Sequence, residues 1–226
     1  IDNLFCAGRN ISATHSALSS TRVMATCATL GQAVGTAVSL AVKCGLTPRG
    51  VHEKCLAELQ DALQDDDCYL PGRQRKVSQT SLEAGLVATA SNPEPLRNGW
   101  DRPINDDVNA WEAPVGSVVS YRFDSPVKVD EIRLVFDSDL TENNPNLPCA
   151  YALEPGLLAL PSSLVKAYRL EAVRENDRIE IVKEESCNLQ RLVRVPVAGA
   201  FRAIEFTPLS IWGGGDMARV FAFEVK

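Results

Sequence analysis

The chain has 226 residues, a mass of 24.5 kDa and a formal net charge of −6. Apolar residues make up 45% and charged residues 23%, which is ordinary globular usage and excludes a disordered tail, a collagen-like fibre and a coiled coil. The acidic balance argues against a nucleic-acid partner, because duplex binding needs a concentrated basic surface and no basic run extends beyond residues 73–76.

Residues 1–8 form an apolar stretch that closes in Ala7-Gly8, which predicts a buried strand running into a glycine turn. The first residue is Ile1 rather than Met, and no signal-peptide pattern precedes the strand. We therefore expect the sequence to begin inside a longer protein. The sequence does not decide the compartment, which is the cytoplasm, or the periplasm if an export signal has been removed.

The next elements are predicted to be helical. Residues 23–42 hold no charge, so a membrane span and a buried helix both have to be weighed. The polar residues among them recur every three or four positions: Thr26, Thr29, Gln32, Thr36 and Ser39. This spacing places them on one face and favours a buried helix without a membrane span. Lys43 and Gly45 predict its end, and Thr47-Pro48 predicts the start of a second helix.

The second helix carries an apolar stripe and is predicted to end at Asp65-Asp66-Asp67. Three adjacent carboxylates resemble a metal cluster, but neighbouring residues do not share a helix face, so a solvated helix end is the better interpretation. The seven cysteines are odd in number and contain no CxxC, which fits neither a zinc site nor a disulfide framework. No metal site is predicted.

The composition changes near residue 72, where Pro71-Gly72 opens a polar stretch. We expect one unit at residues 1–72, a linker at 73–81 and a second unit at 82–226. The second unit is rich in proline and predicts eight short strands, at 86–90, 117–123, 129–136, 164–173, 178–183, 189–195, 203–206 and 220–225. The predicted fold class is α+β: a short helical segment followed by an all-β jelly-roll sandwich.

The stretch from Asn3 to Gly35 is the strongest candidate for chemistry. A strand, a polar loop and the start of a long helix follow one another, and such a helix start offers free N–H groups and a positive dipole end to an anion or an electron-rich oxygen. A scaffold without a ligand shows the same pattern. His15 lies in the polar loop, where a structural role and proton transfer both remain open.

The residues themselves add a resemblance. The runs Asn3–His15, Ser19–Cys27 and Leu30–Ala37, and the later Cys68–Gly72, resemble the C-terminal segment of bacterial FAD-dependent oxidoreductases of the glutathione-reductase-like fold. The resemblance covers residues 1–72 and implies FAD as the cofactor of the parent protein.

In that family, the matching positions imply specific roles. Gly8, Arg9 and Asn10 would line the tail of FAD. Arg22, Val23 and Met24 would present backbone N–H groups to the N1/O2 edge of the flavin and stabilise the negative charge of the reduced ring. His15 would lie on the substrate side as a candidate catalytic proton-transfer residue.

One departure from the family pattern matters for binding. The family begins with a strand followed by GxGxxG, whose glycines and helix N-terminus hold the pyrophosphate, and this chain has no GxGxxG. We therefore expect FAD to be absent from the chain on its own and the chain to be inactive. Its implied partner is the missing N-terminal FAD-binding region of the same protein.

The second unit is similar to galactose-binding-like, discoidin-type jelly rolls, through Asn98–Pro103, Val119–Phe123, Ile132–Asp137 and the closing Ala218–Val225. Some of these domains bind glycans at loops on one end of the sandwich. The resemblance makes Trp100, Asp101 and Trp212 candidate carbohydrate-binding residues, with Trp111 either a further platform or part of the core.

Three hypotheses follow for the whole chain. It is the C-terminal part of an FAD-dependent oxidoreductase with an accessory sandwich; or a carbohydrate-binding sandwich without catalysis; or an interaction domain that covers an active site or forms a dimer. The long apolar helix also predicts self-association of the isolated chain, because large exposed apolar patches are uncommon on monomers.

Overall fold

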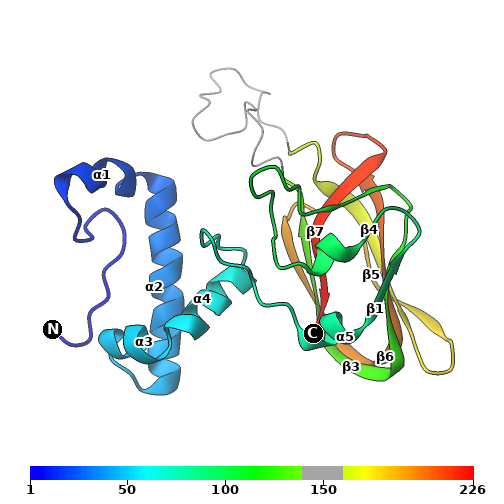
Figure 1. The fold of residues 1–226 in the computed structure, drawn as a ribbon, viewed down its shortest axis with the longest axis horizontal. Coiled ribbons are helices and arrows are strands. Elements are labelled where there is room, and N and C mark those ends of the chain that lie inside the picture. Colours follow the sequence, from blue (N-terminus) through cyan, green and yellow to red (C-terminus); the bar gives the residue numbers. More distant parts are fainter. Residues whose placement is uncertain (139–159) are drawn as a thin grey trace. The chain divides into compact units, whose positions relative to one another are not determined.

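The computed structural model describes residues 1–138 and 160–226. They form two compact units, Ile1–Lys76 and Val77–Lys226 (Figure 1). The division falls within residues 73–81, where the sequence predicts a linker. The stretch between the predicted strands at 129–136 and 164–173 lies largely outside the described residues.

The first unit is helical, with α1 His15–Thr21, α2 Met24–Cys44, α3 Pro48–Lys54 and α4 Leu56–Asp65. The predicted end of the long helix is confirmed, because Gly45 adopts the left-handed conformation (φ 63°) that closes α2. The predicted start of the next helix is also confirmed: Thr47 caps α3 by accepting a hydrogen bond from the Gly50 N–H at 3.1 Å. Helix α1 was not predicted, since its residues read as a polar loop.

The predicted second helix is interrupted at Cys55. Its backbone leaves helical angles (φ −125°, ψ 14°) and separates α3 from α4. The hydrogen bonds continue across the break, because the Cys55 N–H donates to Val51 and the Leu59 N–H donates to Cys55, both at 2.9 Å. The apolar stripe therefore runs over both helices, and α4 ends at Asp65 as the sequence predicts.

The predicted strand at residues 1–8 is wrong. The segment forms no strand, and Ile1 and Leu4 are 98% and 57% exposed. A strand needs a hydrogen-bonding neighbour, and the unit Ile1–Lys76, which is described throughout, contains no strand to pair with it. Only the turn is as predicted: Gly8 has a φ of 86°, which glycine adopts without strain.

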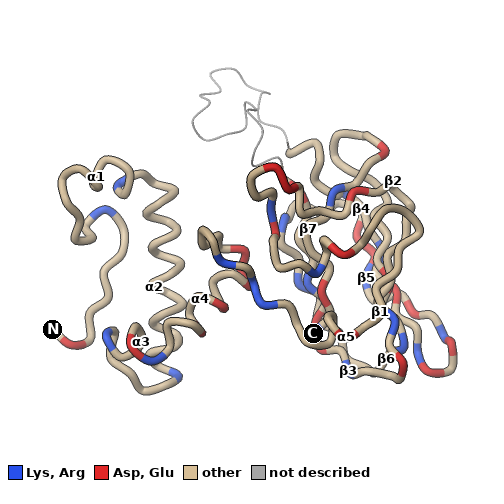
Figure 2. The backbone as a smooth tube through the Cα atoms, viewed as in Figure 1, with Lys and Arg blue, Asp and Glu red and all other residues tan. Residues whose placement is uncertain are grey.

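Helix α2 is also less buried than predicted. Its buried residues are Ala37, Leu40 and Ala41, and this side packs with Val51 of α3, whereas Val42 is 79% exposed. No charged residue occurs between Met24 and Val42 (Figure 2). By length and composition alone, α2 is long and apolar enough to cross a membrane. Core helices of soluble proteins and signal sequences meet the same two criteria.

The second unit is an antiparallel β-sandwich. After the short α5 Gln79–Glu83, its elements are β1 Gly85–Ala88, η1 Glu94–Arg97, β2 Trp111–Pro114, β3 Val119–Phe136, β4 Val165–Val173, β5 Ile179–Glu185, β6 Leu192–Ile211 and β7 Met217–Val225. The strands follow the order β2-β7-β3-β6-β4-β5, and β1 pairs with β3. The predicted fold class, a helical segment followed by an all-β sandwich, is confirmed.

Two strands are much longer than predicted, because β3 and β6 each join two predicted strands. Their pairing shifts register between Arg122 and Val127, an irregularity of the kind that bends a strand. The first part of β3 pairs with β1, and its last part pairs with β7. The short β2 was missed.

Aromatic side chains fill the space between the layers. The ring of Phe206 on β6 lies 5.8 Å from that of Phe223 on β7, and the Tyr121 ring lies 5.0 Å from the Phe223 ring. The Tyr121 hydroxyl donates to the Phe223 carbonyl at 2.8 Å. Trp111 is fully buried and donates through its indole N–H to the Ala90 carbonyl at 2.9 Å. Trp111 therefore belongs to the core.

The first residues of this unit are tied to its last strand. The Ser78 N–H donates to the buried Glu224 carboxylate at 2.6 Å. The buried Ser81 hydroxyl accepts from the Val225 N–H at 2.7 Å and donates to the Val225 carbonyl at 3.1 Å. One serine side chain thus satisfies both backbone groups of a residue at the end of β7.

Candidate functional sites

The N-terminus of α2 is the first candidate site. Helix α1 begins after Thr14, whose hydroxyl accepts from the Ala17 N–H, and it closes at Arg22, whose N–H donates to Leu18 at 3.1 Å. Val23 is extended (φ −72°, ψ 151°), and α2 starts at Met24. Two residues thus separate the helices, because Arg22 ends one and Val23 is the N-cap of the other.

This helix start has no side-chain cap, because valine carries no hydrogen-bond acceptor. The first intrahelical bond runs from the Cys27 N–H to the Val23 carbonyl at 2.9 Å, which leaves the N–H groups of Met24, Ala25 and Thr26 without a partner inside the helix. Arg22, Val23 and Met24 are all exposed, Met24 to 89%. The helix thus presents three backbone donors and a positive dipole end to an external acceptor.

Side chains of the first turn of α2 hold it against the end of α1. The Thr26 hydroxyl donates to the Ser20 carbonyl at 3.3 Å, and the Cys27 thiol donates to the Thr21 carbonyl at 3.6 Å. These contacts fix the direction in which the free N–H groups point. They leave those N–H groups themselves unused.

Of the remaining residues singled out in this unit, Arg9, Asn10 and His15 are exposed and Gly8 is half-buried. Gly8 forms a turn in which the Ile11 N–H donates to its carbonyl at 3.3 Å, and Arg9 and Asn10 lie on the surface. His15 is the first residue of α1 and is also exposed. Within the described unit, no hydrogen bond or ion pair joins residues 8–10 to residues 22–24. Their shared role at a cofactor remains a prediction.

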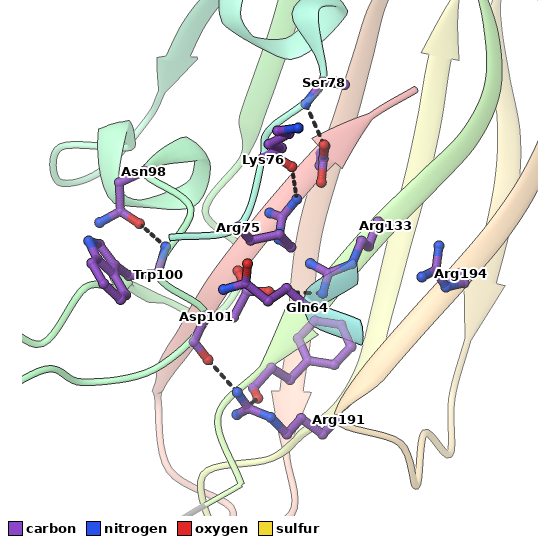
Figure 3. A network of polar contacts seen from close by, with 12 residues as sticks. Gln64, Arg75, Lys76, Ser78, Asn98, Trp100, Asp101, Arg133, Arg191 and Arg194 are labelled. Atoms are coloured by element: carbon purple, nitrogen blue, oxygen red, sulfur yellow. Dashed lines mark hydrogen bonds and ion pairs between the residues drawn. The ribbon is translucent and has the colours of Figure 1, made fainter. Parts of the chain in front are cut away.

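A buried ion pair joins Asp101 to β3 on the face of that strand opposite to Ile132 and Leu134 (Figure 3). The carboxylate of Asp101 contacts the Arg133 guanidinium at 2.8 Å, and the Arg133 side chain on β3 is completely buried. The Asp101 backbone carbonyl accepts from Arg191, which also donates to the Phe136 carbonyl at 2.9 Å. The Asp101 side chain is thus committed to holding this loop against β3.

The adjacent Trp100 is half-buried, and its ring points away from Arg133 and Arg191 (Figure 3). The backbone N–H of Trp100 donates to the side-chain oxygen of Asn98 at 2.8 Å. Trp212, just after β6, is also half-buried: its indole N–H donates to the Asn188 carbonyl at 2.7 Å, and the Lys166 ammonium lies 4.8 Å from its ring centre. Sugar binding by Trp100, Asp101 and Trp212 stays a prediction.

A depression of about 320 Å³ lies beside Trp212, lined by its neighbours Ile211 and Gly213. On its wall, Arg219 of β7 contacts the Glu112 carboxylate of β2 at 2.7 Å. Ser162 completes this wall, and the Gly213 N–H donates to its carbonyl at 2.8 Å. A Cβ at Gly213 would come within 2.9 Å of that carbonyl oxygen, so glycine is required there.

Sequence reasoning missed this depression, because its residues come from three distant segments. The strand that carries Glu112 was not predicted, and the sequence does not show that residues 211–219 pack near residues 162–163. Over residues 1–138 and 160–226, no group of three or more His, Cys, Asp or Glu side chains is arranged to hold a metal ion.

The comparisons with known proteins divide along the same line as the units. Residues 1–63 match the family model described as FAD dependent oxidoreductase. This confirms the resemblance of the N-terminal segment, although the match spans just over a quarter of the chain. No curated protein matches the chain.

Solved structures match the sandwich at low identity. The family 32 carbohydrate-binding module of Streptococcus pneumoniae EndoD is 11% identical, with 64% of this chain and 95% of that chain covered and a TM-score of 0.48. The family 32 module of C. perfringens NanJ, solved with galactose, is 14% identical, with coverages of 65% and 95% and a TM-score of 0.45. A fucose-binding module of Streptococcus pneumoniae, SpX-3, is 7% identical, with coverages of 66% and 98% and a TM-score of 0.48.

Proposed function

We propose that the chain is the C-terminal part of an FAD-dependent oxidoreductase and that residues 1–72 form one wall of its flavin site. The observation that carries the proposal is the match of residues 1–63 to the FAD dependent oxidoreductase family. The uncapped start of α2 supports it, because the N–H groups of Met24, Ala25 and Thr26, which have no partner inside the helix, suit the electron-rich N1/O2 edge of a flavin.

In this proposal, FAD supplies the hydride or electron transfer and the chain supplies binding and electrostatics. The backbone N–H groups of Val23 and Met24 face the flavin edge and favour negative charge on it, while Arg22, whose own N–H donates to the Leu18 carbonyl, lies beside them. Gly8, Arg9 and Asn10 lie along the cofactor's tail, and His15 moves a proton on the substrate side. The sandwich serves as an accessory domain.

The phosphate-binding part of the site belongs, in this proposal, to an N-terminal region of the same protein. The chain contains no GxGxxG, the motif that holds the pyrophosphate in this family. We expect the purified chain to lack flavin absorbance. A yellow protein would refute this part of the proposal.

The substitution Met24→Pro tests whether the start of α2 contacts the flavin. It is made in the longer protein that includes the proposed N-terminal FAD-binding region. Proline at the first helical position removes one N–H and is compatible with the helix. The extended conformation of Val23 is the one that a residue before proline prefers. Met24→Ala is the matched control, because it removes the side chain and keeps the N–H.

A hydrogen bond to a charged acceptor contributes about 1.5–3 kcal/mol. If Met24 donates to the reduced flavin, Met24→Pro lowers the two-electron reduction potential by about 30–65 mV relative to Met24→Ala. Potentiometric titration of the flavin absorbance measures this. Equal reduction potentials in the two variants would show that the Met24 N–H does not donate to the flavin.

A second candidate function is carbohydrate binding by the sandwich, and the depression beside Trp212 favours it. The wall of this depression offers the Glu112 carboxylate, the Arg219 guanidinium and the hydroxyls of Ser162 and Ser163, which can hydrogen-bond to a sugar ring with several hydroxyls. The half-buried Trp212 directly follows Ile211 of this wall in the sequence. A glycan array with the chain and with Trp212→Ala and Trp100→Ala tests it. Binding that is lost with Trp212→Ala supports this function, and an array without binding rejects it.

A further inference from the structure

Two cysteines of the first unit meet at a corner between helices. Cys44 is the last residue of α2, and Cys55 joins α3 to α4. Both are free thiols; Cys44 is exposed and Cys55 is half-buried. Ten residues separate them in the sequence, and those residues hold the turn at Gly45 and all of α3.

The packing of the helices brings the two side chains together. Ala41 of α2 and Val51 of α3 belong to one apolar cluster, and Cys55 packs against it. Lys43, which precedes Cys44, reaches Glu58 of α4, three residues after Cys55, with an N–O distance of 3.4 Å. Cys44 follows Ala41 by three residues and so lies on the same side of α2, one turn further on, next to the cluster against which Cys55 packs. The two thiols are close enough to influence each other electrostatically.

The two thiols differ in their surroundings. Desolvation, followed by the neighbouring Cys44 thiol and then Glu58, raises the pKa of the Cys55 thiol above its ordinary value, and Lys54 opposes this in part. Cys55 is therefore less often a thiolate than an ordinary cysteine, and the thiolate is the reactive form. Cys44 is the more accessible member of the pair.

We propose that Cys44 and Cys55 form a reversible dithiol–disulfide pair that reacts with low-molecular-weight disulfides. The Cys44 thiolate attacks one sulfur of the reagent RSSR, which forms a mixed disulfide and releases RS⁻. The Cys55 thiolate then attacks the Cys44 sulfur and releases the second RS⁻. In sum, two thiols lose two electrons and two protons, and one RSSR is reduced to two RSH.

This site is independent of the proposed flavin role. A bond between these residues would join the end of α2 covalently to the start of α4. It would fix the α2–α3 corner, at which the only other described cross-links are side-chain packing and the exposed Lys43–Glu58 ion pair. Oxidation would therefore act on the C-terminal end of α2, whose N-terminal end carries the free N–H groups.

The test uses the whole chain, equilibrated with glutathione disulfide or with dithiothreitol. Combined cleavage after Lys, Arg and Glu separates residues 44–49 from residues 55–58 and leaves Cys68 in another peptide. We expect oxidation to link these two peptides, and dithiothreitol to release them. Glutathione adducts on Cys44 and Cys55 separately, without a linked peptide, would overturn the proposal.

Variants make the test specific. In Cys55→Ser the link is lost and a stable glutathione adduct accumulates on Cys44, whereas Cys187→Ser, which removes another exposed thiol, keeps the link. A trivalent arsenical, phenylarsine oxide, offers a second measurement, because it is held by two neighbouring thiolates. We expect Cys44→Ser to lose at least tenfold in affinity for it. Equal affinities of Cys44→Ser and the unchanged chain would contradict the pairing.

Discussion

The ion pair between Asp101 and Arg133 gives the sharpest test of the sandwich. The Arg133 side chain is 0% exposed and that of Asp101 only 8%, so Asp101→Ala leaves a guanidinium buried without this carboxylate. Removing one partner of a buried ion pair costs about 3–5 kcal/mol. For a unit of this size, that loss lowers the unfolding temperature by roughly 6–20 °C.

Urea unfolding followed by tryptophan fluorescence is a suitable assay, because Trp100, Trp111 and Trp212 all lie in the unit Val77–Lys226. Asp106→Ala is the matched control, since Asp106 is an exposed carboxylate of the same loop. A surface substitution of this kind changes stability by no more than about 0.5 kcal/mol.

A double variant separates the buried charge from other effects of the loop. Replacing both partners, in Asp101→Ala with Arg133→Met, removes the buried guanidinium together with the carboxylate, so we expect it to recover most of the lost stability. The reasoning is refuted if Asp101→Ala unfolds within 1 kcal/mol of Asp106→Ala, on the order of the error of such measurements.

Three further predictions follow from the described contacts. Ser81→Ala leaves the Val225 N–H without its side-chain partner, whereas the Val225 carbonyl keeps the Ser78 hydroxyl as a donor; the unfolding free energy of the sandwich should fall by about 1–3 kcal/mol, measured by urea titration. Burial, followed by the charge of Glu185, raises the pKa of Tyr168 to about 12, and burial also raises that of Tyr121. Unfolded tyrosine ionises near pH 10, so the stability of the sandwich should hold below about pH 10 and fall as the pH rises toward 12, while ultraviolet titration shows late ionisation. Gly45→Ala forces a left-handed alanine at the end of α2 and should cost about 1–2 kcal/mol, measured by thermal unfolding and helical circular dichroism.

Local signals in the sequence were sufficient for the parts of the fold that depend on single residues. Gly45 ends α2 and Thr47-Pro48 starts α3 because the required backbone angles and cap belong to those residue types. The strand predicted at residues 129–136 matches the last part of β3, because every second side chain of a strand faces the core. The family resemblance of the N-terminal segment was likewise readable from continuous runs of residues.

Features that depend on pairing could not be predicted in this way. Residues 1–8 have the apolar pattern of a strand but find no strand to pair with in their unit. The four residues of β2 are a strand because β7 lies beside them. Asp101 was predicted as a candidate sugar ligand, because the sequence does not show that Arg133 is buried opposite it.

The contacts of Ser78 and Ser81 have a consequence for how the sandwich can be joined to other proteins. They bring the first residues of the unit Val77–Lys226 within hydrogen-bonding distance of Glu224 and Val225 at its last strand. A domain whose two ends meet can be inserted into a surface loop of another chain, or circularly permuted, without stretching its host. The sandwich therefore has the architecture of a transferable module, which suits reuse of one domain beside different partners.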